Sequence, residues 1–117
     1  MKKIPDFVAV DLETTGLEFE SDEIIEVALV RFVKGKPGDS LDFLVKPDRA
    51  ELRPFIECLT GIAKADLDAA EGFADIAGKI CEFIGDLPLV AHNAAFDSRF
   101  LKNSLKKVGI DYENHPF

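Results

Sequence analysis

The segment FVAVDLETTGL, residues 7–17, ends an apolar run with two acids that stand two positions apart. The run 7–10 is too short for an independent helix and is typical of a buried strand. Because successive side chains of a strand point to opposite faces, we expect Asp11 and Glu13 on the same face. Two adjacent carboxylates repel each other, and Mg²⁺ or Mn²⁺, which prefers carboxylate oxygens, would neutralise them. The alternative is an ordinary solvated strand end.

A third acid, Asp97, lies near the end of the chain and also follows an apolar segment. Residues 87–91 predict a short strand, and Asn93 is a good N-cap for a helix over 94–108. Asp97 would lie in the first turn of that helix, on the side of its apolar stripe, where the helix dipole favours an anion. A capping role is the alternative. If the three acids meet at one rim of a sheet, they suit two metal ions about 4 Å apart, an arrangement that hydrolyses phosphodiesters.

The hydrophobic pattern places these acids in a chain of mixed strands and helices. It predicts strands over 6–13, 24–33 and 41–45, a hairpin turn over 34–38, and helices over 63–70 and 73–85. Residues 48–72 are otherwise irregular, with a turn over 59–62. Glu26 lies inside an apolar strand and needs a partner, and we expect it to hold the first loop by hydrogen bonds. His92 has three interpretations: a ligand, a base or a structural residue.

The composition is that of one small folded domain. The chain has 117 residues, of which 47% are hydrophobic, enough for a core but without the long apolar run of a membrane span. Its net charge of −8, from 14 basic and 22 acidic residues, argues against a nucleic-acid binder that relies on a basic face. An enzyme that meets phosphate through bound metal is compatible with that charge. Two cysteines without a metal-binding spacing, and no signal-peptide pattern, predict a reducing cytoplasm.

Two motifs and a middle segment resemble those of the DEDD 3′–5′ exonucleases. The first motif is Asp11-x-Glu13-Thr14-Thr15-Gly16, and the second is His92-Asn93-x-x-Phe96-Asp97. Leu59-Thr60-Gly61-Ile62 resembles the segment that abuts the terminal nucleotide in that family. The likeness covers essentially all 117 residues. It is greatest to proofreading exonuclease domains similar to the epsilon subunit of bacterial DNA polymerase III.

The resemblance implies an α/β chain with the ribonuclease-H-like three-layer fold and a mixed sheet. It implies a nuclease that removes 3′-terminal nucleotides as nucleoside monophosphates, with two Mg²⁺ or Mn²⁺ ions as cofactors. Asp11 would bridge both ions, Glu13 would bind the catalytic ion, and Asp97 would hold the other. The terminal nucleotide would contact a further set of residues, namely Thr14, Thr15, Gly16, Leu17, Leu59, Thr60, Asn93 and Phe96.

The same resemblance implies the biological setting. The expected partner is a single-stranded nucleic-acid 3′ end, with DNA favoured, in DNA replication beside a polymerase, without a membrane and in the cytoplasm. An exoribonuclease is one alternative. A catalytically inactive module that binds nucleic acid or a polymerase is another.

The family has a third motif, a His followed five residues later by an Asp, which residues 1–117 do not contain. His115 cannot supply it, because only Pro116 and Phe117 follow. From the sequence we therefore expect residues 1–117 to be the N-terminal two-thirds of a single exonuclease domain, without its C-terminal strand and helix. We expect this chain alone to be inactive and to self-associate through exposed apolar surface.

Overall fold

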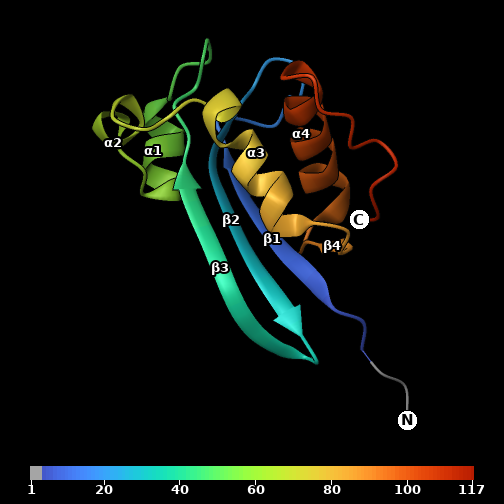
Figure 1. Cartoon of the computed structure of the whole chain (residues 1–117). Coiled ribbons are helices and arrows are strands. Elements are labelled where there is room, and N and C mark those ends of the chain that lie inside the picture. The colour runs from blue at the N-terminus through green and yellow to red at the C-terminus, as the bar shows by residue number, and fades with distance from the viewer. Residues whose placement is uncertain (1–3) are drawn as a thin grey trace.

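The computed structural model describes residues 4–117, which form a four-stranded mixed sheet with helices packed against it (Figure 1). The strands are β1 (Phe7–Thr14), β2 (Ile24–Val33), β3 (Lys36–Leu44) and β4 (Leu89–Val90). The helices are α1 (Pro54–Thr60), α2 (Lys64–Asp68), α3 (Phe73–Ile84) and α4 (Ala94–Lys107). The sheet order is β3-β2-β1-β4; β1 to β3 are antiparallel neighbours, and β4 runs parallel to β1. The expected α/β fold with a mixed sheet is confirmed.

One face of the sheet forms the main core with α3 and α4. The buried hydrophobic side chains of β1 are Val8, Val10 and Leu12, and they belong to one cluster with Ile80 of α3 and Leu101 of α4. Figure 1 shows both helices lying across this face. The two acids of β1 have the opposite parity along the strand, so they point away from this core.

A bulge in β2 allows a second, smaller core. Glu13 pairs with Glu26 and Thr14 pairs with Ile24, so Ile25 is an extra residue in the ladder. Ile24 stays in the main core, whereas Ile25 is fully buried among residues of α1 and α2. This second core consists of Ile25, Ile56, Ile62 and Leu67, with Leu44 and Leu52 packed against it. Helices α1 and α2 consequently lie at the end of the sheet where β2 begins (Figure 1).

Helix α1 replaces the irregular stretch and turn that the sequence predicts for this region. Pro54 occupies its first turn, where a missing N–H costs nothing, and Gly61 ends it with a φ of 74°. The helix is short, and both Phe55 and Leu59 are exposed, so no apolar periodicity marks it. The proline and the glycine were the available signals.

The hairpin between β2 and β3 is tighter than predicted. Lys34 and Gly35 both have positive φ angles, 54° and 78°, and they make a two-residue connection. As a result β3 begins at Lys36 and not at residue 41. Pro37 is tolerated within the strand because β3 lies at the edge of the sheet.

The last residues of the chain lie along the free edge of β4. The Leu89 N–H donates to the Pro116 carbonyl at 2.9 Å, and His115 Nε2 lies 2.7 Å from the Leu87 carbonyl. Strand β4 is shorter than predicted, whereas α3 and α4 end within one residue of their predicted bounds. Within residues 4–117, no helix combines the length and the apolar character needed to cross a bilayer.

Candidate active site

Four acids share the sheet face that points away from the main core. Glu13 of β1 stands opposite Glu26 of β2, and Asp11 stands opposite Ala28. Ala28 in turn stands opposite Asp42 of β3. Because directly opposed residues of a sheet point to the same face, these carboxylates are spread over three adjacent strands. The prediction that Asp11 and Glu13 share a face is confirmed.

Helix α4 brings a fifth carboxylate to this group. Asp97 lies in the first turn of the helix, and only 7% of it is exposed. Burial, and then the charges of Asp11 and Glu13, raise the pKa of Asp97 to about 6, against a lowering effect of His92. Burial and the charge of Asp11 also raise the pKa of Glu13. The structure therefore brings the three predicted acids close enough to feel one another's charge.

No ion pair neutralises these carboxylates in the part of the chain that the structure describes. The ion pairs there are Arg31–Asp39, Arg49–Asp48 and Lys64–Asp68. Carboxylate oxygens without a basic partner are the donor type that suits Mg²⁺ or Mn²⁺. As placed, however, no three Asp, Glu, His or Cys side chains among residues 4–117 form a group that could hold a metal ion. Unneutralised acids repel one another, which favours such a spread.

The prediction that Glu26 holds the first loop is wrong, because Asp22 and Thr15 hold that loop by side-chain hydrogen bonds. Burial, Asp42 and then the charge of Glu13 raise the pKa of Glu26 to about 7. Glu26 thus belongs to the acidic face. Glu23 accepts hydrogen bonds of 2.6–2.9 Å from three successive backbone N–H groups at residues 48–50, which lowers its pKa despite burial.

A cleft of about 560 Å³ opens beside Glu13 and has mostly apolar walls. Six of the residues predicted to contact a terminal nucleotide line it, namely Thr14, Gly16, Leu17, Leu59, Thr60 and Phe96. Sequence reasoning missed four further lining residues: Leu12 of β1, and Arg53, Phe55 and Ile56, the last three because it missed helix α1. Leu17, Phe55 and Leu59 are 80%, 72% and 69% exposed. Large apolar side chains gathered in the open around a cleft mark a binding surface.

The other two predicted contacts, Thr15 and Asn93, do not line this cleft. Thr15 is fully buried, and its hydroxyl donates to Asp22 at 2.9 Å while it accepts from the Glu23 N–H. Asn93 caps α4 by accepting a hydrogen bond from the Phe96 N–H at 3.4 Å. Thr15 therefore stabilises the loop that carries Gly16 and Leu17, and Asn93 stabilises the start of the helix that carries Phe96.

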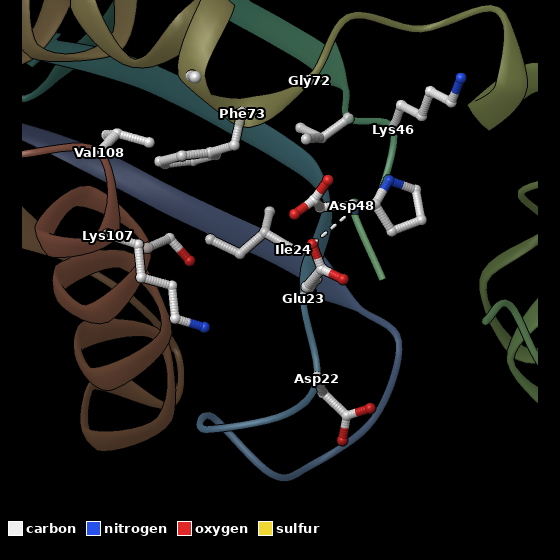
Figure 2. Close-up of a pocket in the computed structure, with 13 residues that line it drawn as sticks. Asp22, Glu23, Ile24, Lys46, Asp48, Gly72, Phe73, Lys107 and Val108 are labelled. Carbon is white, nitrogen blue, oxygen red and sulfur yellow. Dashed lines mark hydrogen bonds between the residues drawn. The ribbon is translucent and has the colours of Figure 1, made fainter. Parts of the chain in front are cut away.

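A second cleft, of about 640 Å³, lies between α4, the start of α3 and the beginning of β2 (Figure 2). Its charged residues include Glu23, whose carboxylate accepts a hydrogen bond from the Asp48 N–H (Figure 2). Lys107 stands on the opposite side and lowers the pKa of Glu23. None of Asp11, Glu13 and Asp97 lines it. This cleft is separate from the candidate active site.

Comparison with known proteins decides the family. Residues 8–117 match the family model RNase_T, described as exonuclease. The chain belongs to this exonuclease family. The two motifs that carry the resemblance in the sequence lie within the matched residues.

Relatives in the family are much longer proteins. The chain is 41% identical over 108 residues to the PolC-type DNA polymerase III of Thermotoga maritima, covering 92% of this chain and 8% of that protein. It is 36% identical over 110 residues to the 3′-5′ exonuclease DinG of Staphylococcus epidermidis, covering 94% of this chain and 12% of that protein. The chain thus spans about a tenth of the length of these relatives.

Solved structures confirm the ribonuclease-H-like exonuclease fold. E. coli exonuclease I in complex with a dT13 oligonucleotide superposes with a TM-score of 0.82, at 22% identity, over 96% of this chain and 26% of that chain. The zinc-bound form of the E. coli enzyme with single-stranded DNA gives a TM-score of 0.84, over 97% of this chain and 26% of that chain. At this level of identity the similarity establishes the fold alone.

Proposed function

We propose that this chain is the catalytic part of a metal-dependent 3′–5′ exonuclease that acts on single-stranded DNA in the cytoplasm and releases nucleoside monophosphates. The observation that carries the proposal is the position of Asp11, Glu13 and Asp97. Burial and then the charge of Asp11 raise the pKa of Glu13 and of Asp97, and Glu13 lines a cleft with exposed apolar walls. Uncompensated carboxylates next to a binding cleft are expected at a catalytic site and not at a structural one.

Asp11, Glu13 and Asp97 would hold two Mg²⁺ or Mn²⁺ ions. When bound, such ions activate water and stabilise the charge that develops on the phosphate oxygens. Asp97 contributes a carboxylate on a rigid helix, whereas Asp11 and Glu13 contribute theirs from a strand whose ladder to β2 fixes their spacing. The three carboxylates would thus come from rigid elements, which position ligands more exactly than a loop would.

The cleft beside Glu13 would receive the 3′-terminal nucleotide. Leu17, Leu59 and Phe96 offer apolar surface that accepts any base by stacking and packing, without reading a hydrogen-bond pattern. Such contacts suit an enzyme that removes all four nucleotides. Because Glu13 belongs to both the acidic group and the cleft wall, a nucleotide in the cleft places its phosphate next to the acids.

The names of the relatives support the direction of cleavage and the DNA substrate. One relative is a DNA polymerase III and the other is a 3′-5′ exonuclease. We propose a role in DNA replication or repair, with a polymerase as the partner.

The test measures nucleotide release from a 3′-labelled single-stranded DNA by the full-length gene product, with Mg²⁺, Mn²⁺ or EDTA. Asp11→Asn keeps the shape and removes the charge, and because metal-derived stabilisation is worth several kcal/mol, we expect a loss of more than about 100-fold. Asp66→Asn, an exposed acid of α2, should keep full activity. If Asp11→Asn retains more than about a tenth of the wild-type rate, Asp11 holds no catalytic ion.

The same assay separates the alternatives. A matched RNA oligonucleotide that is degraded while DNA is not would identify an exoribonuclease. Binding of either strand without metal-dependent release would identify a binding module. Either result overturns the proposal as stated.

A further inference from the structure

The two walls of the cleft beside Glu13 come from separate parts of the chain. One wall is the loop over residues 14–17, which begins at the last residue of β1, and the other is helix α1, while Leu12 and Glu13 of β1 and Phe96 of α4 complete the lining. Arg53 immediately precedes α1, and its Nη2 donates a hydrogen bond of 3.0 Å to the Thr15 carbonyl. In the described part of the chain, this is the one hydrogen bond that joins the loop to the helix and its first flanking residue.

The guanidinium of Arg53 also packs against the backbone of Gly16. A Cβ built on Gly16 would lie 2.6 Å from Arg53 Nη2 and in closer contact still with the Asp22 carboxylate. Real Cβ atoms do not approach other heavy atoms this closely, so any larger residue at position 16 would have to displace the side chains of Asp22 and Arg53. The loop is thus held between Asp22 on one side and Arg53 on the other.

Both ends of the Arg53 contact are anchored. Thr15 is fully buried, and its hydroxyl is bonded to Asp22 and to the Glu23 N–H. On the other side, the Glu23 carboxylate binds the backbone of residues 48–50, which lead into Arg53. Ile56 of α1 packs on Ile25 in the second core. A contact between two fixed elements determines their separation, whereas one between mobile elements would not.

We propose that Arg53 is a positioning residue that sets the width of the cleft and thereby the affinity for the 3′-terminal nucleotide. The inference rests on the proposed function. Asp11 and Glu13 precede the loop on β1, and the paired strand β2 fixes them independently of Arg53. Loss of Arg53 therefore widens the binding cleft and leaves the reacting centre in place. Arginine suits this role because its planar guanidinium keeps its donors in fixed directions.

The experiment compares Arg53→Ala and Arg53→Lys with a matched control, Arg49→Ala. Arg49 belongs to the same segment and carries the same charge, but its side chain is 94% exposed and reaches only Asp48, at 4.0 Å. The readouts are KM and kcat of the full-length gene product on 3′-labelled single-stranded DNA, and inhibition by the product dTMP.

For Arg53→Ala we expect KM and the dTMP inhibition constant to rise about tenfold, which corresponds to about 1.4 kcal/mol, with kcat within about twofold of wild type. Arg53→Lys keeps a positively charged donor group but lacks the planar guanidinium, so it should recover part of the affinity that Arg53→Ala loses. Arg49→Ala should equal wild type. Melting temperatures of all variants are measured alongside, and if Arg53→Ala does not fold, the Lys variant carries the comparison.

An unchanged KM in Arg53→Ala, or a fall in kcat with KM unchanged, overturns the proposal. An equal rise in KM for Arg49→Ala overturns it too, because the effect would then come from net charge. If the wild type releases no nucleotide at all, the proposed function fails by itself. Stabilisation of the folded protein by dTMP, measured as a rise in melting temperature that Arg53→Ala loses and Arg49→Ala keeps, would then still support the role of Arg53.

Discussion

Replacing Asp97 by Asn should stabilise the metal-free protein at neutral pH. The pKa of Asp97 is raised from its ordinary value of 3.8 to about 6, first by burial and then by Asp11 and Glu13. A shift of roughly two units corresponds to about 3 kcal/mol of unfavourable free energy for the charged form. The amide of Asn must itself be accommodated, so we expect a net gain of about 1–3 kcal/mol, or roughly 4 °C in melting temperature per kcal/mol for this chain length.

The pH dependence of this gain distinguishes electrostatics from packing. The folded pKa of Asp97, about 6, lies above the unfolded value, so the folded state binds the proton more tightly. In the wild type, the stabilisation of the folded state by the tighter proton binding at Asp97 is fully present below the unfolded pKa of about 3.9. It is lost as the pH rises through about 6. The advantage of Asp97→Asn should therefore be small at pH 4, grow between pH 4 and 6, and level off above pH 7.

The assay is thermal and urea unfolding in EDTA, followed by circular dichroism at pH 4, 6 and 8. The matched control is Asp75→Asn, an exposed acid in the first turn of α3, which has only a helix dipole to stabilise it. That variant should be slightly destabilised, by about 0.3–1 kcal/mol. A lower stability of Asp97→Asn at pH 8, or a gain equal at pH 4 and pH 8, would refute the reasoning.

Two further substitutions test the acidic face and the loop. Glu26→Gln should raise the melting temperature in EDTA at pH 8 and have little effect below about pH 4. The reason is that the pKa of Glu26 is raised to about 7, so the wild type loses stability as the pH rises through that value. An unchanged melting temperature at pH 8 would argue against this prediction. Gly16→Ala should cost about 1–3 kcal/mol in urea unfolding and raise KM, since its methyl group would displace Asp22 and Arg53, whereas Gly78→Ala, which meets nothing within 4 Å, should be tolerated.

The candidate site was predictable as far as local patterns reach. The parity of β1 places Asp11 and Glu13 on one face, and the cap at Asn93 places Asp97 in the first turn of α4. Both are consequences of backbone geometry within a few residues. The long apolar runs likewise predicted β2, α3 and α4 to within a residue or two. The choice between an enzyme and a solvated strand end required the family comparison.

Other features depend on residues distant in the chain. The register of β2 against β1 and β3 decides that Glu26 joins the acidic face, and a single bulge at Ile25 creates the second core. Helix α1 is stabilised by that core and not by a periodic pattern of its own, so only Pro54 and Gly61 at its ends marked it in the sequence. With α1 come Arg53 and Phe55 as lining residues of the cleft.

By itself, then, the sequence determined which residues are candidates for the chemistry and which elements they stand on, because periodicity, caps and motif spacing are local properties. Only the tertiary structure decided how closely the acids approach, how far their pKa values rise, and which side chains wall the cleft. Those quantities depend on burial and on distances between segments 14–17, 53–60 and 96–97, which strand register and core packing fix together. Distances between segments that are far apart in the sequence are set only when the chain folds, so local sequence patterns cannot predict them.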